Sequence, residues 1–131
     1  MILHYEYEIA AGHRILDYSG KCRFLHGHNY FFQIEIETED LDEVGFVIDF
    51  NEVKEILLSL DHKVLLRKDD PLADILEAQS QPVVRMEGNP SAENIARYVA
   101  ERLVDRIGRR LRRLRVVVWE NRRGSVEYIY P

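Results

Sequence analysis

The chain has a single cysteine, Cys22, among its 131 residues. One thiol cannot form an intrachain disulfide, so the sequence excludes a disulfide-stabilised secreted scaffold, and we expect a cytoplasmic protein. The first residues lack a cationic segment followed by an apolar core, which argues against a signal peptide. No apolar run is long enough to span a bilayer, so we expect no membrane association.

Repeats, low-complexity tracts and flexible linkers are also missing. Apolar residues make up 46% of the chain and charged residues 31%, a balance that is typical of a globular protein and too apolar for disorder. A chain of this length is close to the usual size of one domain. We therefore treat residues 1–131 as a single domain.

Charge is distributed unevenly along the chain. Residues 1–88 hold 8 Lys and Arg against 18 Asp and Glu, whereas residues 89–131 hold 10 against 5, which gives net charges of −10 and +5. The basic segment lacks the interleaved aromatic residues of a nucleic-acid platform. We interpret it as a solvated or subunit-contacting surface whose cations complement the carbonyl end of a helix, and we expect no nucleic-acid partner.

Four segments have the residue pattern of strands, and the first two alternate apolar and polar residues as half-buried strands do. They are residues 3–9, 30–37, 114–119 and 125–130. The segment Asn121–Gly124 separates the last two and predicts a hairpin turn. These four strands are expected to form one antiparallel sheet.

Two helices are predicted between the strand pairs. Asp49 or Asn51 can cap the first, and Asn89 or Ser91 the second, which ends near Gly108. The order of elements indicates an α+β fold, a four-stranded antiparallel sheet with two main helices on one face. Residues 70–77 are expected to form a short helix and residues 82–86 a short extended piece. Such a sheet has open edges and an uncovered face, so oligomerisation is expected.

Three histidines have the spacing of a metal site. His26 and His28 stand at i and i+2, so in an extended segment they point to the same side. His13 ends the first strand and can supply a third nitrogen if the two strands pair. Three histidines with one open position are the pattern of a catalytic zinc site. The alternative is ordinary surface or core histidines, which this clustering disfavours.

Three further positions can carry chemistry. Cys22 precedes His26 by a short turn and can be either a fourth metal ligand or a free thiol acting as base or nucleophile. Asp61 can orient His62, although an ordinary helix terminus is an equal alternative. Glu120 ends an apolar strand, where its carboxylate either faces water or accepts two parallel N–H donors from a flat heterocycle.

Six ordered blocks of this sequence together resemble one family, and they span nearly the whole chain. The blocks are Ala10–Arg14, Cys22–Tyr30, Gly45–Phe50, Leu60–Lys63, Asn89–Asn94 and the strand that ends at Glu120. The family is that of the 6-pyruvoyl-tetrahydropterin synthases. The spacing of Cys22 and His26 and the segment Val47–Phe50 are similar to its prokaryotic branch, the 6-carboxy-5,6,7,8-tetrahydropterin synthases of queuosine and deazapurine biosynthesis.

The resemblance implies a tunnelling fold (T-fold), in which the four-stranded sheets of three subunits close a barrel and two trimers stack into a hexamer. It also implies active sites at subunit interfaces. The implied roles are zinc binding by His13, His26 and His28, catalysis by Cys22, Asp61 and His62, and pterin binding by Glu120, with Ser91 and Glu93 near it.

The implied reaction converts 7,8-dihydroneopterin triphosphate to 6-carboxy-5,6,7,8-tetrahydropterin with release of acetaldehyde and triphosphate. Zinc would stabilise charge on the side-chain oxygens while Cys22 and His62 move protons. Arg14, Lys21 and Arg23 are candidates for contact with the triphosphate. The alternatives are a 6-pyruvoyl-tetrahydropterin synthase or related pterin side-chain lyase, and a zinc- or pterin-binding module without turnover. The intact Cys22, Asp61 and His62 disfavour the module.

Overall fold

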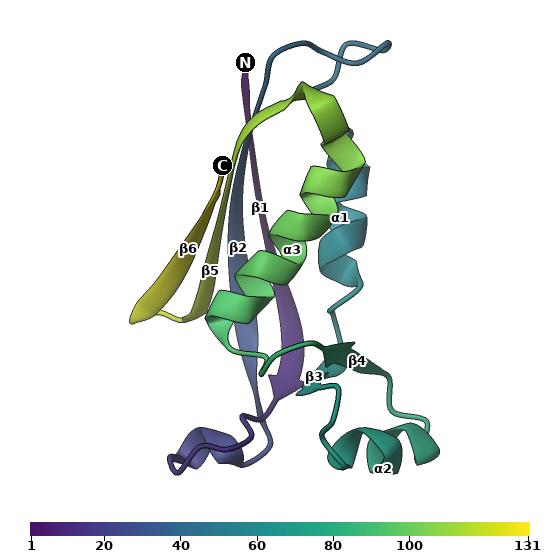
Figure 1. Cartoon of the computed structure of the whole chain (residues 1–131), viewed down its shortest axis with the longest axis vertical. Coiled ribbons are helices and arrows are strands. Elements are labelled where there is room, and N and C mark those ends of the chain that lie inside the picture. Colours follow the sequence, from purple (N-terminus) through teal and green to yellow (C-terminus); the bar gives the residue numbers. More distant parts are fainter.

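The computed structural model describes residues 1–131 as one curved sheet with three α-helices (Figure 1). The strands are β1 (Ile2–His13), β2 (His26–Thr38), β3 (Lys63–Arg67), β4 (Val83–Met86), β5 (Leu111–Asn121) and β6 (Gly124–Tyr130). The helices are α1 (Phe50–Leu58), α2 (Leu72–Ala78) and α3 (Ala92–Ile107), with short 3₁₀ turns at Lys21–Arg23 and Gly108–Arg110.

The strand order across the sheet is β4-β3-β1-β2-β5-β6. β1, β2, β5 and β6 pair antiparallel with their neighbours, as the sequence predicts. β3 and β4 add two parallel strands at the β1 edge. The prediction of a four-stranded antiparallel sheet is therefore wrong, because the sheet is mixed and has six strands. The two main helices are present as α1 and α3.

The two added strands lie in the part of the sequence with the weakest pattern. β3 has 5 residues and β4 has 4, and β3 pairs with only three residues of β1, Ala11 to His13. Leu65 and Leu66 are adjacent and both have 0% exposure, so β3 does not alternate. The expected short helix at 70–77 and extended piece at 82–86 are confirmed as α2 and β4.

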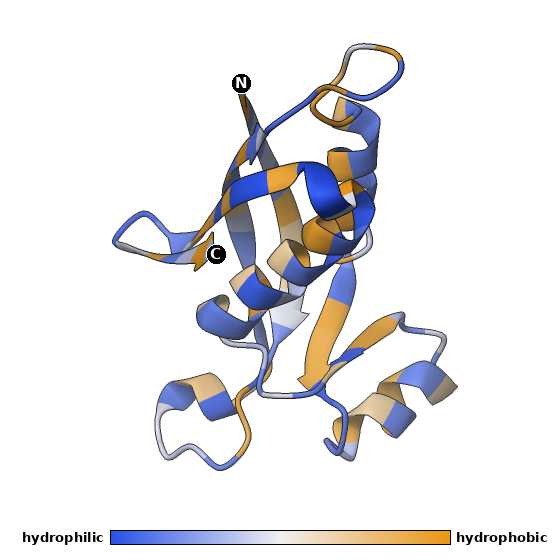
Figure 2. Ribbon diagram, turned by 45° about the horizontal axis from the view of Figure 1, so that its top comes forward, coloured by the Kyte–Doolittle hydropathy of each residue, from blue (hydrophilic) through white to orange (hydrophobic).

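One face of the sheet carries the hydrophobic core. Alternate residues of β2, among them Tyr30 and Phe32, are fully buried under α1 and α3. Figure 1 shows these two helices on the same side of the strands, and Figure 2 shows hydrophobic and hydrophilic residues alternating along their turns. The opposite face of the sheet has no helix over it, and its edge strand β6 is largely exposed.

The predicted helix termini are confirmed and each has a local cause. Asp49 caps α1 by accepting a hydrogen bond from the Asn51 N–H, and Ser91 caps α3 by accepting one from the Asn94 N–H. Gly108 ends α3 with a φ of 63°, in the region that favours glycine. The cap of α3 fixes the start of that helix beside the end of β1.

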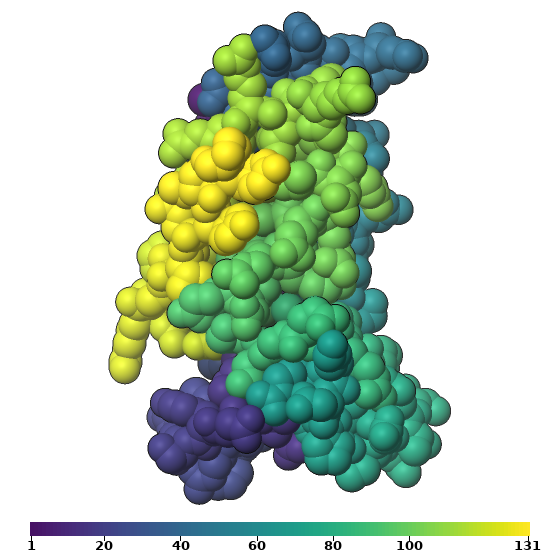
Figure 3. All heavy atoms as spheres, in the orientation of Figure 1, coloured from purple at the N-terminus to yellow at the C-terminus, as the bar shows by residue number.

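Three loops gather at the end of the sheet where β1 finishes. They are residues 14–25, the segment around α2, and residues 87–91, and Figure 3 shows the first two side by side at one end of the molecule. This end of the sheet carries the histidines. No helix combines the length and apolarity needed to cross a membrane.

Candidate active site

The three histidines come together as the sequence predicts. In the β1–β2 ladder His13 is opposite His26, and Ala11 is opposite His28. All three side chains therefore project from the same face of the sheet, the one that α3 covers. One nitrogen from each ring lies within 4.8 Å of the others, an arrangement able to hold a metal ion.

Backbone carbonyls orient two of these rings. The Nδ1–H of His13 donates to the Pro90 carbonyl at 2.7 Å, and the Nδ1–H of His26 donates to the Phe24 carbonyl at 2.7 Å. Each Nε2 then carries a lone pair, and the two Nε2 atoms are 3.0 Å apart. The Nε2 of His28 is buried without a hydrogen-bond partner. Nitrogen lone pairs that lie this close repel one another, and a bound cation removes that repulsion.

The electrostatics of the cluster favour neutral, metal-binding imidazoles. Burial lowers the pKa of His13, and its hydrogen bond to Pro90 only partly offsets this. Burial also lowers the pKa of His28, against the influence of Glu120. The Oε1 of Glu120 lies 3.5 Å from His13 Nε2 and 3.6 Å from His28 Nε2. Three converging imidazole nitrogens next to a carboxylate fit a divalent metal.

Cys22 lies near the cluster without belonging to it. It is partly buried in the 3₁₀ turn after β1, and its sulfur is not among the converging ligand atoms. It lines a pocket of about 490 Å³ together with His13, Ser91, Glu93 and Glu120. Of the two alternatives for Cys22, this placement favours a free thiol beside the metal centre over a fourth ligand.

Asp61 and His62 meet in the turn after α1. The Nδ1 of His62 is 2.9 Å from Asp61 Oδ2, while Asp61 Oδ1 accepts the Ala10 N–H at 2.9 Å. Burial opposes ionisation of Asp61, but the hydrogen bonds from Ala10 and His62 outweigh it and hold the pKa of this carboxyl below its ordinary value. Asp61 thus contacts His62, and both the catalytic pair and the ordinary helix terminus with a solvated charge pair contain this contact.

His62 and Cys22 line different pockets. The His62 side chain is 81% exposed and lines a pocket of about 460 Å³ that includes His28 and Gln81. Cys22 lines the pocket that contains His13 and Glu120. Within one chain, the residues expected to move protons are therefore not gathered around one cavity.

Glu120 and α3 supply the remaining predicted residues. Glu120 lies at an irregularity of β5 between Trp119 and Asn121, is 31% exposed, and faces the histidines. Glu93 lies in the first turn of α3. The hydroxyl of Ser91 accepts the Asn94 N–H at 3.3 Å, so capping the helix already uses this group.

Two of the three basic candidates for triphosphate contact are engaged elsewhere. Arg14 forms a two-point ion pair with the buried Asp70. Arg23 donates to the carbonyls of Ser19 and Gly20. Lys21 remains as the basic side chain of this loop without such a contact.

Several groups at the site are absent from the sequence prediction. The carbonyls of Phe24 and Pro90 orient two histidines, and backbone acceptors leave no signature in residue identity. The Tyr30 ring packs edge-on against His13 and His28, and its hydroxyl is buried without a partner. Burial raises the pKa of this phenol. The signal in the sequence is that Tyr30 follows His28 by two residues in the same strand, which places both side chains on one face.

The fold and the histidine centre define a class, an α+β protein with a built site for a divalent metal. A family model described as 6-pyruvoyl tetrahydropterin synthase matches residues 2–130. The chain belongs to this family. The 6-carboxy-5,6,7,8-tetrahydropterin synthase of Rickettsia conorii is 36% identical over 107 residues, covering 76% of this chain and 78% of the Rickettsia protein. The named relatives are enzymes.

Solved structures support the same fold. The 6-pyruvoyl tetrahydropterin synthase of Plasmodium falciparum aligns with a TM-score of 0.65 at 20% identity and covers 98% of each chain. That of Caenorhabditis elegans aligns with a TM-score of 0.64 at 23% identity, covering 100% of this chain and 96% of the nematode protein. At these identities the likeness establishes the fold alone.

Proposed function

We propose that this protein is a zinc-dependent lyase that converts 7,8-dihydroneopterin triphosphate and one water to 6-carboxy-5,6,7,8-tetrahydropterin, acetaldehyde and triphosphate. The observation that carries the proposal is the convergence of three imidazole nitrogens beside the Glu120 carboxylate and the Cys22 pocket. Membership of the family and the 36% identity to the Rickettsia synthase support the substrate class. The product belongs to deazapurine (queuosine) biosynthesis.

Glu120 is proposed to hold the pterin ring. A carboxylate can accept two parallel N–H bonds from a 2-amino-pyrimidinone edge, and a charged acceptor makes each bond stronger. Glu120 is next to His13 and His28, so a ring held there keeps the substrate side chain at the metal centre. Glu93, in the same pocket, is a weaker candidate for contact with the ring.

Cys22 and His62 are proposed to move protons at the carbons of the substrate side chain. Asp61 bonds the Nδ1 of His62, which leaves the Nε2 of that ring free to take or give a proton. Each such transfer contributes on the order of 10²–10⁴ in rate. Zinc bound by His13, His26 and His28 would supply Lewis acidity toward the vicinal hydroxyls of the substrate.

Self-association is part of the proposal. Cys22 and His62 line separate pockets within one chain, and β6 presents an open edge. A trimer or a hexamer of this chain can bring the two groups to one substrate across a subunit interface. No nucleic-acid or membrane partner is proposed.

The test is an anaerobic incubation of zinc-loaded protein with 7,8-dihydroneopterin triphosphate, followed by mass identification of the pterin. A 6-carboxy product together with acetaldehyde is the expected result. A 6-pyruvoyl product would be consistent with the assigned site residues but would overturn the product assignment. Bound zinc and bound pterin without turnover would indicate a binding module.

A matched pair of variants tests the pterin anchor. Glu120→Gln keeps the size of the side chain but loses the charge and one acceptor, so pterin affinity should fall at least tenfold, while Glu127→Gln on β6 should leave it unchanged. If Glu120→Gln binds pterin normally, the anchoring role is wrong.

A further inference from the structure

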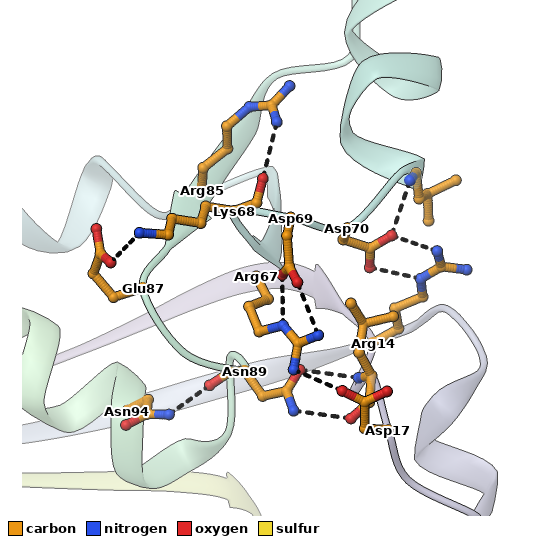
Figure 4. Close-up of polar contacts among 12 residues, drawn as sticks. Arg14, Asp17, Arg67, Lys68, Asp69, Asp70, Arg85, Glu87, Asn89 and Asn94 are labelled. Carbon is orange, nitrogen blue, oxygen red and sulfur yellow. Dashed lines mark hydrogen bonds and ion pairs between the residues drawn. The ribbon is translucent and has the colours of Figure 1, made fainter.

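The side chain of Asn89 binds the backbone of Leu16 at two points. Its Nδ2 donates to the Leu16 carbonyl at 3.0 Å, and its Oδ1 accepts the Leu16 N–H at 2.9 Å. Figure 4 shows this pair of bonds joining two loops from distant parts of the chain. The amide of Asn89 thus pairs with both the N–H and the carbonyl of Leu16, as the backbone of a neighbouring strand would.

Asn89 and Leu16 each have a sequence neighbour that is hydrogen-bonded to a residue of the proposed active site. Pro90 follows Asn89 directly, and its carbonyl accepts the Nδ1–H of His13 at 2.7 Å. Ile15 precedes Leu16, and its N–H donates to the Cys22 carbonyl at 3.0 Å. The Asn89–Leu16 contact therefore holds together the acceptor that orients His13 and the loop that carries Cys22.

The backbone of Asn89 is attached to α3, so its side chain is the contact that joins the start of this helix to the loop after β1. Its carbonyl accepts the Ser91 N–H at 2.8 Å and the Asn94 Nδ2 at 2.8 Å, which ties it to the start of α3. Neither aspartate, which has no donor, nor alanine can replace both bonds to Leu16.

The loop after β1 has two other attachments, shown in Figure 4. Arg14 pairs with Asp70, and Arg67 pairs with Asp17 at 3.1 Å. These ion pairs hold the loop on either side of Leu16. Loss of the Asn89 side chain should therefore loosen the Pro90 carbonyl without detaching the loop.

We propose that Asn89 is a positioning residue that sets the metal affinity of His13 by fixing the Pro90 carbonyl against its Nδ1–H. The inference rests on the proposed function in one respect, namely that the three histidines bind a divalent metal. Partners that orient metal-ligating histidines typically contribute about 10–100-fold to metal affinity. The role of Asn89 lies one step further from the metal than such a partner.

The experiment measures Zn²⁺ affinity by chelator competition in the full-length protein. Asn89→Ala should bind Zn²⁺ about tenfold or more weakly than wild type, and Asn89→Asp, which keeps the acceptor for the Leu16 N–H, should be intermediate. Asn51→Ala is the matched control, because Asn51 is exposed on α1. Co²⁺ absorption should change in Asn89→Ala and stay unchanged in Asn51→Ala.

A second control separates positioning from general loss of stability. Leu57 is a fully buried residue of α1 and lines neither pocket of the site, so Leu57→Ala should destabilise the fold without weakening Zn²⁺ binding. Unchanged Zn²⁺ affinity in Asn89→Ala, or an equal loss in Leu57→Ala, would overturn the proposal.

A metal-free measurement keeps the inference distinct from the proposed function. In apo protein with ¹⁵N-labelled histidine, NMR should show His13 as the Nδ1–H tautomer in wild type and Asn51→Ala, and as a mixture of tautomers in Asn89→Ala. An identical tautomer in all three would overturn the positioning role even if the wild type turns over pterin. Conversely, wild type that binds Zn²⁺ in an Asn89-dependent way but yields no 6-carboxy product would overturn only the function.

Discussion

At the scale of single residues, two buried hydroxyls have no hydrogen-bond partner, those of Tyr30 and Thr38. A buried polar group without a partner costs about 1–3 kcal/mol, so removing it should not destabilise the fold. We expect Tyr30→Phe and Thr38→Val each to leave the free energy of unfolding unchanged or to raise it by about 1 kcal/mol. Urea denaturation of metal-free protein measures this. A loss above about 1 kcal/mol would mean that the hydroxyl has a partner.

The thiol of Cys22 lies outside the histidine cluster, which leads to a second prediction. Cys22→Ala should bind one Zn²⁺ per chain with affinity close to wild type while turnover falls by about 10²-fold or more. Cobalt-substituted wild type should likewise lack a sulfur-to-metal charge-transfer band. His28→Ala is the comparison, because it removes a ligand and should weaken binding strongly. Loss of metal from Cys22→Ala would make the cysteine a fourth ligand.

The sequence predicted the histidine cluster because the cluster depends on short-range features, namely the period of one strand and its pairing with the next. His26 and His28 share a face through the two-residue period of a strand, and pairing of β1 with β2 brings His13 opposite. The Pro90 carbonyl was not predictable in this way. Its position depends on the packing of α3 against β5 and β6, which brings a loop 77 residues away in sequence to His13. Side-chain patterns do not encode such backbone contacts.

At the scale of elements, the buried pair of Arg14 and Asp70 joins the end of β1 to the start of α2. Hydrogen bonding from Arg14 lowers the pKa of Asp70, burial opposes this, and the Leu72 N–H adds to the lowering. A folded-state pKa below the unfolded value of about 3.9 gives stability that is present above that pH and is lost as pH falls through the folded value.

Asp70→Asn should therefore be less stable than wild type by about 2 kcal/mol near pH 7. This is below the roughly 3–5 kcal/mol of fully buried pairs, because a charge left on Arg14 can reach water. The difference should stay constant down to about pH 5 and shrink below about pH 4. Urea denaturation of metal-free protein across this pH range measures it. Parallel stability curves for the two proteins at all pH values would show that the ion pair does not contribute.

The elements differ in how well the sequence predicts them, for a physical reason. The antiparallel strands β1, β2 and β6 do not bury both faces, so alternation reveals them. β5 has three consecutive buried valines, Val116 to Val118, and its run of β-branched residues reveals it instead. β3 is buried on both faces at its centre, because Leu65 and Leu66 both have 0% exposure. Its short apolar run is equally consistent with a helix and with a strand, so the pattern does not predict it. Short parallel pairing with β1 also depends on where the loop after α1 leads, which residue patterns do not specify.

At the scale of the whole molecule, one chain does not complete the proposed active site. His62 is largely exposed and lines one pocket, whereas Cys22 lines another. The sheet also ends in an open edge at β6, where Ile129 and Tyr130 are exposed. An exposed edge with apolar side chains is a natural site of self-association. Both features have the same explanation if Cys22 of one subunit and His62 of its neighbour act on one substrate.

This explanation predicts complementation between two inactive variants. Cys22→Ala and His62→Ala should each lose most turnover alone. Oligomers that contain both should recover about a quarter to a third of the wild-type rate, because intact Cys22 meets intact His62 at about one site in three in a mixed trimer and at about one in four in a larger random assembly. Co-expression with two affinity tags isolates the mixed oligomers, and product formation by mass measures the recovery. Mixed oligomers that stay inactive would place both groups of each site in the same chain, and the separation of the two pockets would then require a conformational change within the subunit.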